Sequence, residues 1–171
     1  LWLKEEAKKV GLNGVHMQLI QTEPSAGNVS GVDAGEFIDS CNPEQLGFDS
    51  LTHYQYVHFT DVNRDYEEII SDVVKEWEKL GKKYKIPYYP HVSIGWDNNP
   101  RFSFFREKII KNNTTENIEK ILRFAKKYAD EYHRPLITVN SWNEWTESSY
   151  LQPDNINGYG YLEAIKRVFG N

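Results

Sequence analysis

The chain has 171 residues, which is enough for one domain with its own hydrophobic core. A hydrophobic share of 39%, a charged share of 26% and a net charge of −5 without a basic cluster argue against a disordered chain and against a nucleic-acid partner. The single cysteine excludes an internal disulfide framework, and no apolar run approaches the roughly 20 residues that a membrane span needs.

The first third of the chain contains one predicted helix and two predicted strands. Residues 1–10 have the apolar spacing of a helix, and Gly11 is placed to end it. Residues 14–20 then alternate as a strand does. Residues 22–46 are rich in Pro, Gly, Ser and Asp and predict a long connection, after which residues 48–54 predict a second short strand.

The best amphipathic pattern follows in the middle of the chain. Residues 66–80 carry apolar side chains at i, i+3 and i+4 spacing, which predicts a helix that Gly81 would end. A third strand is predicted over residues 87–94. A polar loop that contains Trp and Asn follows it over residues 95–101.

The last third repeats the same order. Residues 118–128 have a second strong helical pattern, with Asn113 as the predicted cap and Glu116 three residues later as in a capping box. A fourth strand is predicted over residues 136–141, and the chain closes with a helix over residues 162–169.

Alternating strands and helices predict an α/β fold with parallel strands joined by right-handed crossovers. Four strands cannot close a barrel, whereas eight can. We therefore expect one domain over residues 1–171 that is the C-terminal half of a (β/α)8 TIM barrel. An open four-stranded α/β domain is the alternative. A chain that lacks a starting Met and opens inside a helix also predicts a fragment of a longer protein.

In a barrel of this kind, the polar residues that follow each strand's C-terminal end form the active face. The sequence places such residues at 21–23, 53–56, 96–101 and 143–147. Glu23 is a candidate third acid. His53 and Tyr54 end the second predicted strand and are candidate substrate contacts, although a lone histidine at such a position is more often structural.

The strongest candidate site is the segment over residues 143–147, which contains Glu144 and Glu147. Cleavage of a glycosidic bond needs one carboxylic acid to protonate the leaving oxygen and a second group to assist attack. Because i and i+3 point to opposite faces of a straight strand, the two glutamates converge only if the chain turns after Glu144. Two solvated acids on a loop are the alternative. Large aromatic side chains nearby disfavour it, at Trp142, Trp145 and Tyr150.

The loop over residues 95–101 is the second candidate. Its carboxylate and amide groups can bind sugar hydroxyls, and Arg101 can hold Asp97 or a charged substrate through two contacts. An ordinary turn is the alternative. The residues predicted to contact a saccharide are His53, Tyr54, Trp96, Asp97, Asn98, Arg101, Asn143 and Trp145. The histidines are too scattered to predict a zinc site.

These motifs resemble those of WbsX-like polysaccharide-biosynthesis proteins, which belong with the barrel enzymes of glycoside hydrolase family 99, the endo-α-mannanase and endomannosidase group. Residues 92–101 are similar to the strand-seven motif of these families, and residues 47–50 fit their strand-six entry. The resemblance spans roughly residues 5–169. Near the end of the chain it rests on residues 141–147, 150–154 and 159–164.

The resemblance implies a retaining glycosidase that uses the substrate's own 2-hydroxyl as nucleophile, without a metal or another cofactor. Glu144 would be the base that deprotonates this hydroxyl, and Glu147 the acid/base that protonates the leaving oxygen. Two residues depart from the family pattern: Ser148 stands where Gly is usual, and Gln152 stands where Glu is expected before the proline. Many WbsX-like proteins also carry a glycosyltransferase label.

Three hypotheses follow. The first is a glycoside hydrolase-like enzyme that cleaves an oligo- or polysaccharide with the two glutamates. The second is a glycosyltransferase-like protein of surface polysaccharide synthesis, such as lipopolysaccharide or O-antigen. The third is a non-catalytic carbohydrate-binding or structural half-barrel. The open sheet edges of any half-barrel would favour a homodimer. The resemblance also implies a location in the bacterial cytoplasm or cell envelope.

Overall fold

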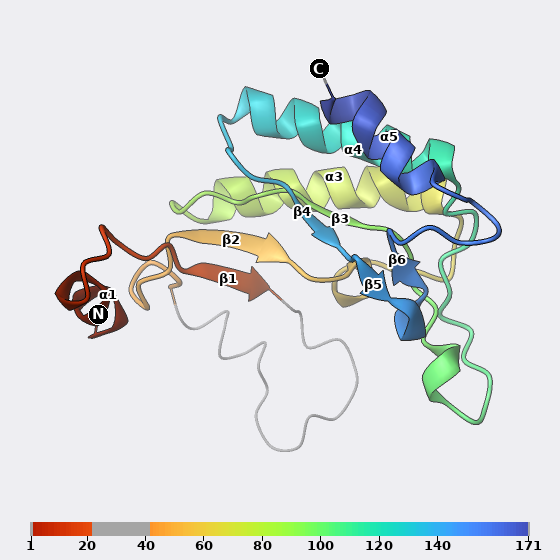
Figure 1. The fold of residues 1–171 in the computed structure, drawn as a ribbon, viewed down its shortest axis with the longest axis horizontal. Helices are drawn as coiled ribbons and strands as arrows, with labels where there is room; N and C mark the ends of the chain where they lie inside the picture. The colour runs from red at the N-terminus through yellow and green to blue at the C-terminus, as the bar shows by residue number, and fades with distance from the viewer. Residues whose placement is uncertain (1, 22–41, 171) are drawn as a thin grey trace.

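The structure, a computed structural model, describes residues 2–21 and 42–170 (Figure 1). Glu23 lies outside the described residues. The described helices are α1 (Trp2–Lys9), α3 (Tyr66–Lys83), α4 (Thr115–Glu131) and α5 (Gly160–Phe169). The described strands are β1 (Gln18–Gln21), β2 (Ser50–His53), β3 (His91–Ser93), β4 (Thr138–Asn140), β5 (Asn143–Glu144) and β6 (Ser149–Tyr150). Short 3-10 turns lie at η1 (Tyr56–His58), η2 (Asn99–Arg101) and η3 (Trp145–Glu147).

The first four strands are parallel and lie in the order of the sequence. β1 pairs with β2, and β3 pairs with β4. A parallel bridge between Leu51 and Tyr88 joins the two pairs, and the Leu51 N–H donates to the carbonyl oxygen of Pro87 at 2.9 Å. The α/β fold with parallel strands is therefore confirmed. Each strand is shorter than its predicted segment, and whether they form half of a barrel stays a prediction.

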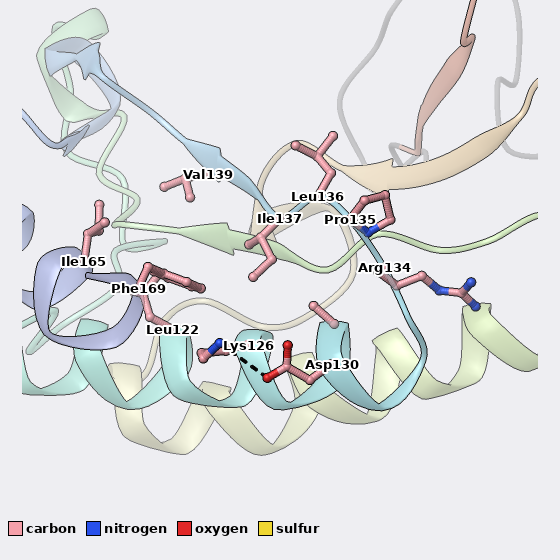
Figure 2. Close-up of a pocket in the computed structure, with 11 residues that line it drawn as sticks. Leu122, Lys126, Asp130, Arg134, Pro135, Leu136, Ile137, Val139, Ile165 and Phe169 are labelled. Carbon is pink, nitrogen blue, oxygen red and sulfur yellow. Dashed lines mark ion pairs between the residues drawn. The ribbon is translucent and has the colours of Figure 1, made fainter. Parts of the chain in front are cut away.

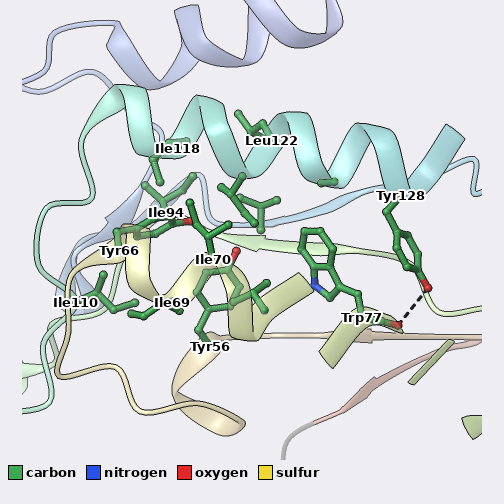
Figure 3. Packing of buried hydrophobic residues seen from close by; sticks show 14 of the residues in the cluster. Tyr56, Tyr66, Ile69, Ile70, Trp77, Ile94, Ile110, Ile118, Leu122 and Tyr128 are labelled. Atoms are coloured by element: carbon green, nitrogen blue, oxygen red, sulfur yellow. Dashed lines mark hydrogen bonds between the residues drawn. The ribbon is translucent and has the colours of Figure 1, made fainter. Parts of the chain in front are cut away.

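Two long helices cover one face of these strands (Figure 1). The predicted apolar faces of α3 and α4 are confirmed, because their side chains at i, i+3 and i+4 positions are buried together (Figure 3). Trp77 on α3 is among the largest fully buried side chains, and burying such a side chain contributes roughly 1.5–3 kcal/mol. In the described part of the chain, no helix combines the length and apolar character needed to cross a bilayer.

Two glycines were predicted to end helices, and the structure confirms only one of these predictions. Gly11 does so: its φ is 86°, and N–H groups of Gly11 and Leu12 donate back to the last turn of α1. The prediction for Gly81 is wrong, because α3 continues to Lys83. A Cβ at Gly81 would lie 2.5 Å from the Tyr128 hydroxyl, so this glycine allows α4 to approach α3 closely.

The start of α4 also differs from the prediction. Thr114, not Asn113, is the cap, and its hydroxyl accepts the Asn117 N–H at 3.3 Å. The Asn113 side chain instead donates to the carbonyl oxygen of Ile94 at 3.1 Å. Asn113 therefore ties the helix start to the loop that follows β3, which carries part of the candidate site.

An apolar cavity of about 400 Å³ lies between α4, α5 and the side of β4 (Figure 2). An ion pair between Lys126 and Asp130, 3.4 Å long, crosses its rim. Its apolar lining includes Leu122, Ile137, Val139, Ile165 and Phe169. None of the predicted site residues lines it, so this cavity is not the candidate active site.

Candidate active site

The chain turns immediately after Glu144. β5 and β6 pair in antiparallel fashion, with Asn143 opposite Tyr150, and η3 forms the turn between them. This turn brings Glu144 and Glu147 to one side of the segment. The predicted turn after Glu144 is therefore confirmed.

Ser148 ends this turn in a left-handed conformation, with φ at 51° and ψ at 34°. This explains why glycine is usual here in the family that the sequence resembles, since only glycine adopts this conformation without cost. The departure at Ser148 therefore leaves the turn intact and adds backbone strain of roughly 1 kcal/mol.

We predict that Ser148→Gly raises the free energy of unfolding by up to about 1 kcal/mol, because it removes this strain. Thermal unfolding checks the prediction through a higher melting temperature. Ser103→Gly, at an exposed loop position outside the left-handed region, is the matched control and should not stabilise the chain. A Ser148→Gly variant no more stable than the parent would show that the turn carries no strain.

Arg101 binds both glutamates at once. Its Nη1 donates to Glu147 Oε1 at 2.8 Å, and its Nη2 donates to Glu144 Oε1 at 3.0 Å. Its Nε also donates to the Thr146 hydroxyl at 2.9 Å, and that hydroxyl donates to Glu144 Oε1 at 2.6 Å. The sequence predicted that Arg101 would bind Asp97 or a charged substrate, whereas in the structure it binds the carboxylates of Glu144 and Glu147. These contacts show that both carboxylates converge on one guanidinium.

The two carboxylates lie in different surroundings. Glu147 is only 5% exposed, whereas the Glu144 side chain is 34% exposed. Gln55 donates to the second oxygen of Glu147, Oε2, at 3.3 Å and to Asn140 Oδ1 at 2.7 Å. One buried, fully partnered carboxylate beside one solvated carboxylate is an arrangement that lets two like groups take different roles.

The loop after β3 is tied to the turn through its backbone. The Asp97 N–H donates to the Glu147 carbonyl oxygen at 2.8 Å. A Cβ at Gly95 would lie 2.5 Å from the Ser148 carbonyl oxygen, so glycine is needed there for the two segments to meet. The Asp97 carboxylate accepts two hydrogen bonds from Asn99, one from its backbone N–H at 2.9 Å and one from its side-chain amide at 2.7 Å. Asp97 therefore shapes the loop that presents Arg101.

Trp145 is held in one orientation beside the glutamates. Its ring stacks on Tyr150, with centroids 3.7 Å apart and planes at 21°. Its indole Nε1 donates to Gln152 Oε1 at 2.6 Å. The departure at Gln152 therefore keeps the acceptor that a glutamate would supply. Trp145 remains exposed, and an aromatic face with a fixed orientation suits stacking on a sugar ring.

Tyr54 and His53 are neighbours in sequence but lie in different places. The Tyr54 hydroxyl is beside the glutamates: burial, followed by the negative charge of Glu147, raises its pKa, and a hydrogen bond with Asn140 opposes this. His53 is buried and hydrogen-bonds to the Tyr88 hydroxyl at 2.8 Å. Burial lowers the pKa of His53 to about 3, so its ring is neutral at pH 7 and faces the interior.

The structure thus groups five predicted residues closely, namely Tyr54, Arg101, Glu144, Trp145 and Glu147. Trp96 packs against the hydrophobic core, and Asn143 is exposed in β5. Asn98 precedes η2 at the base of the loop. Sequence reasoning did not single out Gln55 and Asn140. Their one signal was that each lies at or just past a strand end.

The described residues hold no cluster of three or more His, Cys, Asp or Glu side chains that could bind a metal ion.

Comparison with known proteins gives the family. The model of the family described as Glycosyltransferase WbsX matches residues 2–165. The chain belongs to the WbsX family. The resemblance to WbsX-like proteins seen in the sequence is thereby confirmed.

Two curated relatives of this WbsX chain are both named Uncharacterized protein WxcX, from two strains of Xanthomonas campestris pv. campestris. Each is 27% identical over 146 residues, which cover 74% of this chain and 20% of the relative. The chain therefore spans about a fifth of the length of these relatives. No solved structure matches the chain.

Proposed function

We propose that this chain carries the acid/base pair of a glycoside hydrolase-like enzyme that acts on an oligo- or polysaccharide. The observation that carries the proposal is the convergence of Glu144 and Glu147 on the guanidinium of Arg101. Membership of a polysaccharide family supports a saccharide substrate, and the exposed Trp145 ring beside the pair supports stacking on a sugar.

In the proposed reaction, Glu144 takes the proton of the substrate's 2-hydroxyl, whose oxygen attacks the anomeric carbon. The bond to the leaving oxygen breaks as Glu147 gives that oxygen a proton. Water then opens the intermediate, with Glu147 as base and Glu144 returning its proton to the 2-oxygen. The buried glutamate suits the acid/base role and the more exposed one suits contact with a sugar hydroxyl.

A glycosyltransferase is the second candidate, and the description of the WbsX family favours it. Under this alternative the same carboxylates would activate an acceptor hydroxyl, and the sugar would come from an activated donor. The hydrolase is preferred here because two carboxylates that converge at a strand end form the apparatus that glycosidic cleavage needs.

The experiment that separates these candidates is turnover of aryl glycosides by the full chain with and without nucleotide sugars. A panel of α- and β-linked nitrophenyl glycosides of several hexoses is the probe. The hydrolase predicts release of nitrophenol without any donor. Sugar transfer that requires a nucleotide sugar, with no donor-free release, would contradict it and favour the transferase. Saccharide binding without either activity would favour the non-catalytic alternative.

We further propose that the four parallel strands are the second half of a (β/α)8 barrel. Their sequence order supports this, as does the position of the glutamates at strand C-terminal ends. Among described strands, nothing pairs with the second edge of β4, and the apolar cavity lies beside it. In a longer WbsX protein, a first barrel strand and its helix would fill this place. If the structure of such a longer protein left the second edge of β4 exposed to solvent, it would contradict the proposal. Homodimerisation stays a prediction.

A further inference from the structure

A buried glutamine directly after β2 supports the inner side of the acid/base pair. Gln55 has an exposed fraction of 0%. Its Nε2 donates to Asn140 Oδ1 at 2.7 Å and to Glu147 Oε2 at 3.3 Å. Its Oε1 accepts a short hydrogen bond from the Ser93 hydroxyl. The Gln55 amide therefore joins the ends of three strands, and each of its polar atoms has a partner.

These partners fix which way the amide points. Turning it over would place its oxygen against Asn140 Oδ1 and Glu147 Oε2, so that three acceptors would face one another without a hydrogen. The Ser93 hydroxyl would also lose Gln55 as an acceptor and keep only the Gly95 carbonyl oxygen, 3.3 Å away. The N–H side of Gln55 must therefore face Glu147.

The two oxygens of Glu147 consequently differ. Oε2 is directed inward and accepts a hydrogen bond from the fully buried Gln55. Oε1 is directed toward Arg101, whose side chain is 40% exposed. An oxygen that accepts an N–H cannot at the same time carry a proton pointed at that donor. Oε1 can therefore carry a proton only while the partly exposed Arg101 is withdrawn from it, whereas Gln55 is fully buried beside Oε2. A substrate can approach only from the exposed side.

We propose that Gln55 is a positioning residue that reserves Oε2 of Glu147 as an acceptor and so directs the transferable proton to Oε1. The inference rests on the proposed role of Glu147 as the acid. The leaving oxygen then approaches Oε1, takes its proton and breaks its bond to the sugar. Glu147 is left as a carboxylate, and Arg101 rebinds Oε1. The observed ion pair corresponds to this state after proton transfer.

The test uses Gln55→Met, which keeps side-chain length but removes the donor. The full chain is assayed on aryl glycosides of one sugar whose leaving phenols range from strongly to weakly acidic. A weakly acidic phenol needs the acid, so kcat/KM should fall about 10–100-fold there and only a few-fold for dinitrophenol. Thr52→Val, a buried β2 residue that hydrogen-bonds to the Tyr89 carbonyl and not to Glu147, is the control. It should affect all phenols equally.

The possible outcomes distinguish a failure of the role given to Gln55 from a failure of the proposed function. An equal loss on all phenols, or no loss, would overturn the positioning role of Gln55. Glu147→Gln is run beside it: if Glu147→Gln shows the phenol-dependent loss and Gln55→Met does not, only the inference about Gln55 fails. If Glu147→Gln loses nothing on any phenol, the proposed function itself fails.

A second measurement needs no substrate. It tests the inference on the parent chain even if Gln55→Met folds poorly. Side-chain amide signals in nitrogen-15 NMR should show the Gln55 NH2 protons exchanging slowly with water, unlike those of the exposed Gln45. Glu147→Gln should shift one of the two proton signals, and Ser93→Ala, which releases the amide oxygen, should speed their exchange. Gln55 protons that exchange as fast as those of Gln45, or that ignore Glu147→Gln, would overturn the inference.

Discussion

Glu147→Gln is expected to lower turnover of a glycoside with a weakly acidic leaving group by about 10²- to 10⁴-fold. This is the usual contribution of a positioned general acid, and glutamine keeps the shape while it removes the transferable proton. Steady-state hydrolysis of an aryl glycoside with a weakly acidic phenol, built on the sugar that the parent chain turns over fastest, checks the prediction. Gln55 and Arg101 now donate to separate oxygens of Glu147, and the single amide oxygen of the variant can keep only one of these contacts, so thermal unfolding is measured beside turnover.

The matched control for Glu147→Gln is Glu163→Gln. Glu163 lies in the first turn of α5 with its side chain 65% exposed, and it takes no part in the candidate site. Its replacement should leave turnover unchanged. Glu147→Gln with the parent's turnover on weakly acidic phenols would remove Glu147 from the chemistry.

Arg101→Met is expected to have the second largest effect. It removes the cation from two carboxylates, one of which is buried, so the free energy of unfolding should fall by about 1–3 kcal/mol. The glutamates would also lose the donor that orients both, and turnover should fall by at least about tenfold. Arg101→Lys should recover little of this, because one ammonium group lacks the fork that reaches two carboxylates.

Arg123→Met is the control for Arg101→Met. Arg123 also makes two hydrogen bonds to a glutamate, Glu119, but on the exposed surface of α4. Exposed ion pairs contribute about 0–1 kcal/mol, so chemical denaturation should detect little change. If Arg101→Met were as harmless as Arg123→Met in both stability and turnover, the bridge between the glutamates would have no role.

The fold class followed from the sequence because hydrophobic spacing is a local signal. The i, i+3, i+4 faces of α3 and α4 face the core as predicted. Helix ends were less predictable. Gly81 has the composition of a stop signal, yet its role is decided by Tyr128 on another helix, 47 positions along the chain from it.

The candidate site could likewise be predicted only where its residues are close together in the sequence. Glu144 and Glu147 are three residues apart, so their spacing and a nearby loop predicted a turn. Arg101, however, is 43 and 46 residues from them, and Gln55 is 92 residues from Glu147. Only the meeting of strand ends brings these side chains together. The sequence placed Gln55 at the active face by its position after a strand, and no local pattern predicted which carboxylate oxygen it binds.

The central claim is that Glu144 and Glu147 act as one unit on the same bond. The measurement that tests it most directly is kcat/KM for Glu144→Gln, Glu147→Gln and the double variant, on one glycoside with a weakly acidic phenol. Residues that act as a unit give strongly non-additive losses. We therefore predict that the double variant is only about as impaired as the worse single variant. Losses that multiply, or a single variant with unchanged turnover, would contradict the pairing.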